Sequence, residues 1–240
     1  MERNVTRRSL LEAAGVAAVA GLAGRALAAD GQPAAGAAAP AGAGGGKVRI
    51  VAVSCSPRKG KTTASGLQVC LEEAGKVDPA IETELIDLGE MNIPVFAPGG
   101  SGGDFPKIAS RFTDPAVGGI IVGSPVYFGC MSSLCKAMLD HWNVFRGNFA
   151  LAGKVAGVLA VGAGRNGGQE LTILGIQQVL MAQQMILVGD GAPTAHRGAT
   201  LVNTKDDISK DEQGLATARN LGKWVAQVAL RLSGRAATKG

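Results

Sequence analysis

The sequence predicts a three-layer α/β sandwich, in which helices cover both faces of a parallel β-sheet. From Lys47 onward, short apolar runs rich in β-branched residues alternate with segments whose apolar residues recur at helical spacing. Five such strand-helix units follow one another. This alternation is typical of a parallel sheet because each helix carries the chain back to the same end of the sheet. Most of the apolar runs have no polar interruption, which indicates strands buried on both faces.

The predicted elements follow in order along the chain. Strands are expected at residues 48–53, 81–88, 117–123, 154–161 and 185–189. Helices are expected at residues 62–76, 106–112, 132–144, 169–183 and 210–232. The second strand, IETELIDL, alternates apolar and polar residues as a strand near the edge of a sheet does, and the last helix is amphipathic. Residues 89–103 are rich in Gly and Pro and are expected to form a loop.

The N-terminus has three features of an export signal in the usual order. Arg7 and Arg8 in TRRSLLEAAG are close to the twin-arginine pattern, a mild apolar run follows, and ALA at 26–28 has the spacing of a signal-peptidase site. The apolar run is too short to serve as a stable membrane anchor. We therefore expect a twin-arginine signal peptide at residues 1–28 and export to the periplasm. An ordinary amphipathic or disordered N-terminus is the alternative.

The rest of the chain divides into a linker and one folded domain. Residues 29–46 are almost wholly Ala, Gly and Pro, cannot build a core and are expected to form a flexible linker. Residues 47–240 are long enough for one well-buried domain. The net charge is +5, but Lys and Arg are scattered without a basic stripe, which argues against nucleic acid as a partner.

The loop after the first strand reads SCSPRKGKTT and is the natural anion site of such a fold, because ligands bind beyond the carboxyl ends of the strands. A phosphate there needs backbone N–H groups, hydroxyls and a cation at the start of the next helix. The side chains that offer hydroxyls or positive charge are Ser54, Ser56, Arg58, Lys61, Thr62 and Thr63. Arg58 adds a planar fork that can bind two phosphate oxygens.

Two alternatives to this phosphate site remain open. The tail GKT at 60–62 matches the end of a nucleotide-binding P-loop, but Cys55 stands where that motif needs glycine. Pro57 and Arg58 occupy the segment that should wrap the phosphates, and the third strand ends without an acid to hold Mg²⁺. The second alternative is that the loop is only the ordinary capped start of a helix, since Ser and Thr are common caps.

Two further glycine-containing segments follow the third and fourth strands. GSPVYFG, residues 123–129, presents apolar and aromatic side chains beside backbone groups, as a flat ring with a polar edge requires. GAGRNGGQE, residues 162–170, lets a ligand approach the backbone closely. It also satisfies G-x-G-x-x-G, and with Asp190 after the next strand it leaves a dinucleotide-binding loop open as an alternative.

These three segments resemble the loops of the NADPH-dependent FMN reductase family, particularly its iron-sulfur-flavoprotein-like branch, in which S-x-S-P-R-x-x-x-x-T follows the first strand. The resemblance runs from about residue 48 to residue 228. It implies a flavodoxin-like fold whose five parallel strands are ordered 2-1-3-4-5. It also implies FMN as cofactor, NAD(P)H as co-substrate, a quinone, a flavin or a similar small molecule as electron acceptor, and a dimer or tetramer.

By the same resemblance, FMN-binding residues lie in all three segments. In the first segment they are Ser54, Ser56, Arg58, Lys61, Thr62 and Thr63. In the second they are Pro125, Val126, Tyr127, Phe128 and Gly129. In the third they are Gly162, Gly164, Arg165, Asn166, Gly167 and Gln169. No catalytic side chain is expected, because the flavin itself carries the hydride chemistry.

Cysteines and histidines give no sign of a metal site. Iron-sulfur relatives bind their cluster through cysteines after the second strand, but the loop MNIPVFAPGGSGG has none, so no cluster is expected. His141 is expected to be structural or interfacial, whereas His196 lies either near the flavin or in an exposed loop. The four cysteines lack C-x-x-C spacing and are expected to be small buried residues: Cys55, Cys70, Cys130 and Cys135.

Export would separate the protein from its expected electron donor. NAD(P)H is a cytoplasmic donor, whereas the twin-arginine route delivers folded proteins across the membrane. The sequence therefore leaves open an alternative function: an exported flavodoxin-like electron carrier that turns over no nicotinamide.

Overall fold

The computed structural model describes residues 46–234. The expected signal peptide at 1–28 and the expected linker at 29–46 lie outside the described residues, apart from the last residue of the linker. Both therefore stay predictions. Within residues 46–234, no helix combines the length and the apolar composition that a membrane span requires.

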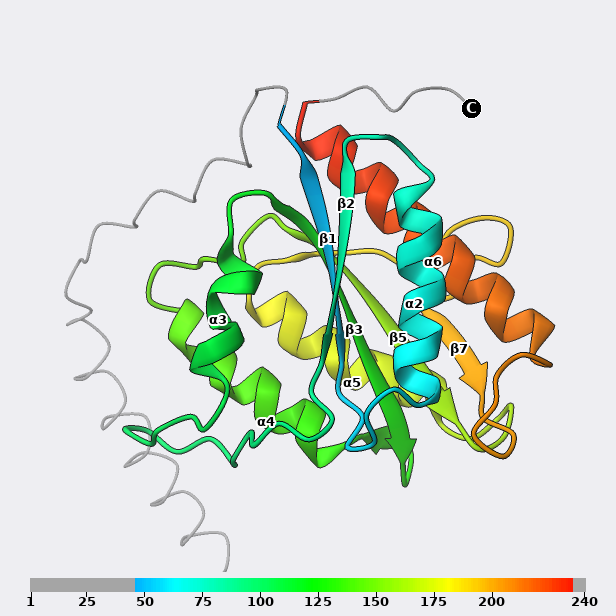
Figure 1. Cartoon of the computed structure of the whole chain (residues 1–240), viewed down its shortest axis with the longest axis horizontal. Coiled ribbons are helices and arrows are strands. Elements are labelled where there is room, and N and C mark those ends of the chain that lie inside the picture. Colours follow the sequence, from blue (N-terminus) through cyan, green and yellow to red (C-terminus); the bar gives the residue numbers. More distant parts are fainter. Residues whose placement is uncertain (1–45, 235–240) are drawn as a thin grey trace, which may run out of the picture. The chain divides into compact units, whose positions relative to one another are not determined.

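The predicted strands and helices occur in the predicted order, with the short strands at 130–131 and 199–202 added (Figure 1). The strands are β1 (Val48–Ser54), β2 (Ile81–Asp87), β3 (Val117–Tyr127), β4 (Cys130–Met131), β5 (Val155–Gly162), β6 (Ile186–Leu187) and β7 (Ala199–Val202). The helices are α2 (Thr62–Gly75), α3 (Pro106–Thr113), α4 (Ser133–His141), the 3₁₀ helix η1 (Trp142–Phe145), α5 (Gln169–Ala182) and α6 (Glu212–Leu232). Each predicted helix is found within a few residues of its expected ends.

Parallel pairing builds the sheet in the order β2-β1-β3-β5, and both β6 and β7 then pair with the far side of β5. Among the described strands, only the short β4 runs antiparallel, against the end of β3. The α/β class and the predicted order of the first four strands are therefore confirmed.

The fifth strand differs from the prediction. Expected at 185–189, it is shortened to Ile186–Leu187, and β7, which was not predicted, continues the same edge further along β5. Between β6 and β7 the chain leaves the sheet at Asp190. The buried carboxylate of Asp190 accepts hydrogen bonds from Thr194 Oγ1 (2.5 Å) and from the His196 backbone N–H. A loop held by an internal acid thus splits the edge strand into two short pieces.

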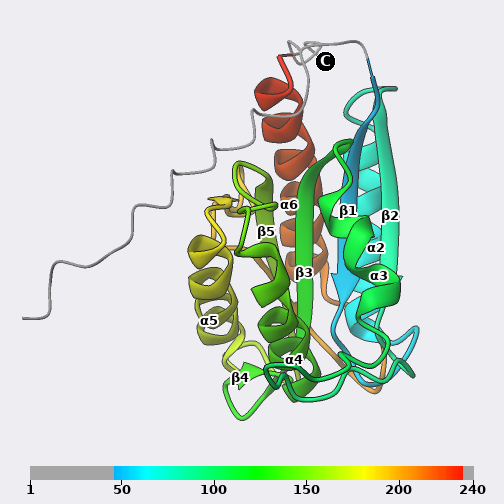
Figure 2. The same ribbon diagram turned by 90° about the vertical axis from the view of Figure 1, so that its left-hand side faces the viewer.

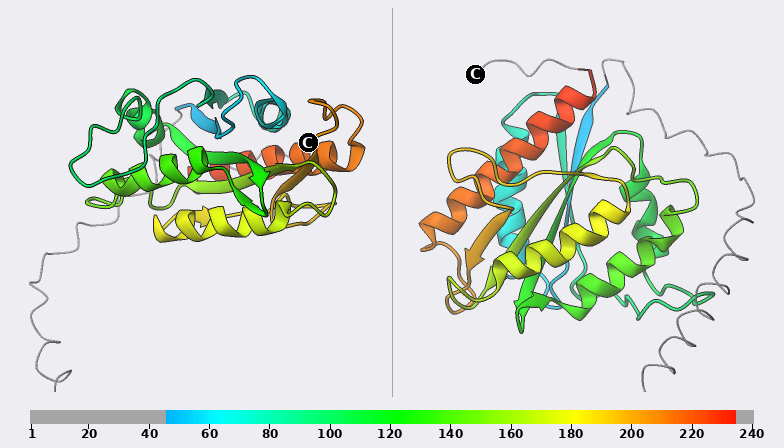
Figure 3. Two further views of the ribbon diagram at one scale, coloured as in Figure 1. Left: turned by 90° about the horizontal axis from the view of Figure 1, so that it is seen from below. Right: turned by 180° about the vertical axis from the view of Figure 1, so that it is seen from behind.

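Two apolar cores fill the space on either side of the sheet. Helices α2 and α6 cover one face, and α3, α4 and α5 cover the other (Figures 1 and 3). Figure 2 shows α3 in front of β1 and β2, with α2 and α6 behind the strands. Successive residues of β1 alternate between the cores, as the two-residue period of a strand demands: Val51 and Val53 face α3–α5, whereas Ile50 and Ala52 face α2 and α6.

Strand β3 extends four residues beyond its predicted end and turns the expected loop 123–129 into a hairpin. Ser124 and Pro125 still pair with β5, because β5 is long enough to supply backbone partners up to Val161. Phe128 and Gly129 have φ angles of 51° and 76° and form the two-residue turn that leads into β4. Pro and Gly in GSPVYFG favoured a loop, and the neighbouring strand instead extends the ladder.

Candidate functional site

The carboxyl ends of the central strands meet at one end of the sheet, the lower end in Figure 1. Because β1, β3, β5 and β7 run parallel, the segments that follow them all leave the sheet there: the loop 55–61, the hairpin turn 128–129, the loop 163–168 and the turn 203–207. The strand order reverses between β1 and β3, and ligands of open α/β sheets bind at such a reversal. The structure thus places all three sequence-predicted segments at one end of the sheet.

Helix α2 begins without a cap, directly after the loop 55–61. Its N-cap residue, Lys61, has an extended backbone and makes no side-chain cap hydrogen bond, and the first turn contains no acidic residue. Ser65 N–H donates to the Lys61 carbonyl (3.0 Å) as the helix starts. The N–H groups before it have no partner inside a helix and carry the positive end of the helix dipole. This end of α2 therefore favours an anion.

Hydrogen bonds within the loop 55–61, and one from the loop to Asp87 of β2, fix the shape of this loop. Ser56 Oγ accepts from Arg58 N–H (3.1 Å) and donates to the Arg58 carbonyl (3.2 Å), so this hydroxyl closes a local turn. Asp87, at the end of β2, accepts from Gly60 N–H (2.8 Å) and from Gly89 N–H (3.0 Å). No local pattern in the sequence indicates the role of Asp87, because only the pairing of β2 with β1 brings it beside the loop.

Two cations of the loop converge on one carboxylate. Arg58 Nη1 lies 2.6 Å from Asp206 Oδ1, and Lys61 Nζ lies 3.6 Å from Asp206 Oδ2. Arg58, followed by Lys61, holds the pKa of Asp206 below its usual range. Asp206 belongs to the turn after β7, and its role was also missed, since no local pattern links it to Arg58, which lies 148 positions earlier.

The remaining hydroxyl residues of the first segment are buried: Ser54, Thr62 and Thr63. Ser54 Oγ has no hydrogen-bond partner among the described residues. Because the Ser54 side chain is fully buried, its direct contact with a phosphate stays a prediction.

The second and third segments touch each other. A side chain at Gly168 would place its Cβ 2.7 Å from Gly129 Cα, so the loop 163–168 lies directly against the hairpin turn. Gly168 also has a φ angle of 101°, which only glycine adopts without strain. On the hairpin, Phe128 is fully exposed and Tyr127 is 44% exposed. The hairpin therefore presents two aromatic side chains beside a loop of close-packed backbone.

Gln169 and Arg165 bind protein groups around the loop 163–168. Gln169 is buried, its Nε2 donates to the carbonyls of Gly164 (2.6 Å) and Leu201 (3.2 Å), and its Oε1 accepts from Gly167 N–H (3.0 Å). Arg165 donates to the Thr200 carbonyl (3.1 Å) and to the Asp211 carboxylate. Both side chains thus stabilise the shape of the loop. The contact with a flavin ring expected for them stays a prediction, as it does for the exposed Asn166.

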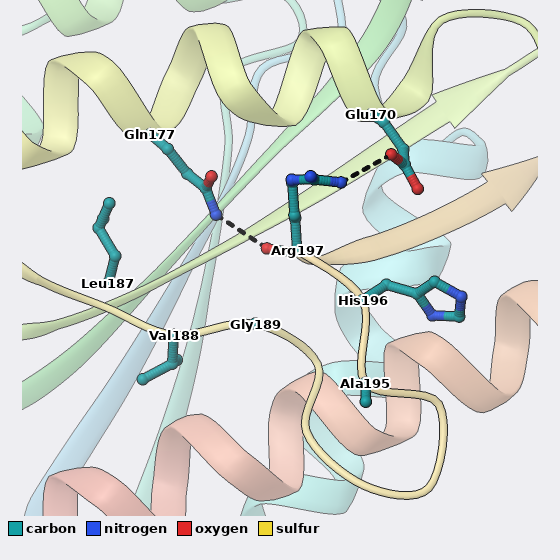
Figure 4. Close-up of a pocket in the computed structure, with 8 residues that line it drawn as sticks. All are labelled: Glu170, Gln177, Leu187, Val188, Gly189, Ala195, His196 and Arg197. Atoms are coloured by element: carbon teal, nitrogen blue, oxygen red, sulfur yellow. Dashed lines mark hydrogen bonds and ion pairs between the residues drawn. The ribbon is translucent and has the colours of Figure 1, made fainter.

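A separate cavity of about 510 Å³ lies between α5 and the loop 188–198 (Figure 4). Arg197 Nη1 pairs with Glu170 Oε2 (3.1 Å), and Gln177 Nε2 donates to the Arg197 carbonyl (2.8 Å). His196 lines this cavity, with Nδ1 3.2 Å from Asp190 Oδ2. Since the Asp190 carboxylate is buried and occupied by these bonds, it is not free to bind a ribose as the dinucleotide alternative requires.

The other histidine and the cysteines have mostly structural roles. His141 is buried, contacts the Pro94 carbonyl through Nε2 (2.9 Å) and stacks on Phe105, as expected for a structural residue. Cys55, Cys70 and Cys135 are buried free thiols, as predicted, whereas Cys130 is exposed because it follows the unexpected hairpin turn. Within residues 46–234, no three Cys, His, Asp or Glu side chains are placed to bind one metal ion.

The chain is similar to known proteins in both sequence and fold. Residues 48–200 match the NADPH-dependent FMN reductase family. An iron-sulfur flavoprotein from Methanocaldococcus jannaschii is 38% identical over 201 residues, covering 75% of this chain and 97% of that protein. An NAD(P)H dehydrogenase (quinone) from Geotalea uraniireducens is 34% identical over 129 residues, covering 48% of this chain and 63% of that protein.

A solved structure shows the same architecture. The flavodoxin, WrbA-like protein from Agrobacterium tumefaciens superimposes with a TM-score of 0.56, covering 77% of this chain and 99% of that chain. The identity is 18%, so the likeness concerns the fold. The flavodoxin-like fold implied by the sequence is therefore confirmed.

Proposed function

Because the chain belongs to the NADPH-dependent FMN reductase family and is an NAD(P)H-dependent FMN oxidoreductase, we propose that it reduces a quinone, a free flavin or a similar small acceptor. When bound, FMN supplies the two-electron hydride chemistry, and the protein supplies binding, orientation and exclusion of water. The quinone is supported by the relative from Geotalea uraniireducens, whose name states that acceptor. The uncapped start of α2 beside two cations is the observation that supports binding of FMN, on which this activity depends.

The described residues fit the phosphate of FMN. The N-terminus of α2 offers backbone N–H groups without helical partners, and Arg58 and Lys61 offer positive charge. Arg58 Nη1 contacts Asp206 (2.6 Å) at the surface, and the planar fork of Arg58 has the geometry to bind two phosphate oxygens. The loop also lacks the glycine-rich wrap of a nucleotidase, and the third strand ends without an acid to hold Mg²⁺, so the P-loop alternative is disfavoured.

The hairpin and the loop 163–168 fit a flat aromatic ring. Tyr127 and Phe128 offer exposed aromatic surface. Gly168 lets the loop 163–168 lie directly against the hairpin turn, so backbone groups of both segments are available to hydrogen-bond the polar edge of a ring. Gln169 keeps the loop in this shape through three hydrogen bonds. These residues would orient the ring, and none of them acts as an acid or a base.

We propose that the protein is a homo-oligomer with an interface next to this site. Large apolar side chains are exposed on the hairpin and on the outer face of α5, which contacts the hairpin: Tyr127, Phe128, Leu171, Leu174 and Met181. Exposed apolar surface of this kind marks interaction sites. Sedimentation equilibrium of wild type and of a Leu171→Glu variant tests this: a dimer or tetramer weakened by the charge supports it, and a monomeric wild type contradicts it.

We also propose that the protein acts outside the cytoplasm and without an iron-sulfur cluster. Arg7, Arg8 and the ALA at 26–28 support twin-arginine export, and the absence of cysteine from residues 89–103 supports the lack of a cluster. Cell fractionation of a double variant, Arg7→Lys with Arg8→Lys, would show export lost if the signal is correct. Iron analysis of the purified protein should give far less than one cluster per chain.

Anaerobic mixing with reduced nicotinamide tests the activity. The purified protein should show the absorption spectrum of an oxidised flavin, and mass analysis of the released cofactor should identify FMN. NADH or NADPH should then bleach the flavin rapidly, and a quinone or free flavin should restore the colour. A flavin that neither nucleotide bleaches would favour the electron carrier. A colourless protein that does not bind FMN at micromolar concentration would contradict the proposal.

A further inference from the structure

The turn after β7 carries a carboxylate on a stiff support. Thr204 and Asp207 exchange backbone hydrogen bonds of 2.8 and 3.1 Å, which close a turn around the two residues between them. These residues, Lys205 and Asp206, have φ angles of 54° and 62°, the left-handed region that non-glycine residues seldom adopt. Asp207 further fixes the turn by accepting from Ser209 N–H (2.8 Å) and Ser209 Oγ (2.7 Å).

This turn directs Asp206 to the two cations of the phosphate loop. One carboxylate oxygen lies 2.6 Å from Arg58 Nη1, and the other lies 3.6 Å from Lys61 Nζ. A carboxylate is an oxyanion, and it contacts here the same groups that would bind phosphate oxygens. The three side chains are between 40% and 49% exposed, and ion pairs in such positions are weak enough for a doubly charged phosphate to replace.

We propose that Asp206 is an internal competitor of the flavin phosphate, holding Arg58 and Lys61 in the flavin-free protein and releasing them when phosphate binds. The proposal rests on the proposed function of the phosphate loop. Since the turn is stiff, the negative charge of Asp206 stays close to the bound phosphate and opposes it. FMN would consequently be held less tightly than the two cations alone allow, and would exchange with free FMN.

An Asp206→Asn variant tests the role of this charge. Asn has nearly the same shape and tolerates the left-handed region, so the turn should be retained. We expect the Kd for FMN to fall about 3- to 10-fold, because a nearby like charge is removed. The Kd for riboflavin, which lacks the phosphate, should change by less than about 2-fold. Titration of the flavin-free full chain by flavin fluorescence measures both constants.

A matched control separates this effect from a general change in charge. Glu90 pairs with Lys59 of the same loop (3.1 Å) and is exposed. Glu90→Gln therefore removes one negative charge from beside the same loop without touching Arg58 or Lys61, and FMN affinity should change by less than about 2-fold. The proposal is wrong if Asp206→Asn leaves FMN binding unchanged. It is also wrong if the variant binds FMN more weakly, because Asp206 would then serve to position Arg58. An equal gain in Glu90→Gln would also contradict it.

Binding of inorganic phosphate, measured as a rise in Tm, tests this proposal separately from the proposed flavin function. If neither wild type nor variant binds either flavin, the proposed function fails, and the phosphate measurement decides the role of Asp206 alone. Phosphate should raise the Tm of Asp206→Asn more than that of wild type. An equal or smaller rise would overturn the competition between Asp206 and phosphate.

Discussion

Replacing Arg58 by Ala should weaken FMN binding without destabilising the fold. The Arg58 side chain is 49% exposed, and its ion pair with Asp206 is at the surface, so its loss should hardly change the free energy of unfolding. In the flavin complex the guanidinium would form charge-assisted hydrogen bonds to phosphate. Losing them costs about 2 kcal/mol, which corresponds to about a 30-fold higher Kd for FMN.

Fluorescence titration with FMN and riboflavin, together with thermal unfolding, checks this expectation. Arg58→Lys keeps the charge but loses the planar fork, so its Kd for FMN should lie between those of wild type and Arg58→Ala. Riboflavin affinity and Tm should stay close to wild type in both variants. The phosphate assignment would be refuted if Arg58→Ala bound FMN as tightly as wild type, or if riboflavin binding fell by the same factor.

Three further predictions concern the loop 163–168 and the sheet. Gln169→Ala removes three hydrogen bonds of a buried side chain and should lower the free energy of unfolding by about 2–3 kcal/mol in urea denaturation, with FMN binding weakened as well. Gly168→Ala forces a φ of 101° on a residue with a side chain and pushes its Cβ against Gly129. It should lower the free energy of unfolding by about 1–3 kcal/mol and weaken the binding of both FMN and riboflavin. Gly147→Ala, with open space around it, is the control and should change neither stability nor binding measurably. Burial lowers the pKa of Lys154 from 10.5 to about 8, so the unfolded chain keeps a proton that the folded protein releases, and this lysine should make stability rise between pH 8 and pH 10.5. Urea denaturation of wild type and Lys154→Met across this range should show the difference, and parallel pH curves for the two proteins would contradict it.

Local pattern was sufficient for most of the fold. The nearly continuous apolar run of β1, interrupted by Arg49 alone before Ser54, and the amphipathic period of α6 predicted both elements close to their observed ends, because each pattern reflects burial of a strand or a helix face. The prediction of the edge strand was wrong because the loop that splits this strand depends on Asp190. The buried carboxylate of Asp190 accepts hydrogen bonds from residues of the loop itself. The hairpin at 128–129 was missed because β5 supplies distant partners that override Pro125.

The sequence by itself determined the class of fold, the positions of its helices and the three segments at the carboxyl ends of the strands, since alternating burial and turn-forming residues are local properties. Only the tertiary structure decided which partners those segments have. Strand pairing placed Asp87 beside the loop 55–61, and the turn after β7 placed Asp206 against Arg58 and Lys61. Contacts between residues far apart in the chain depend on how the strands are ordered and where loops re-enter, and no local spacing encodes them.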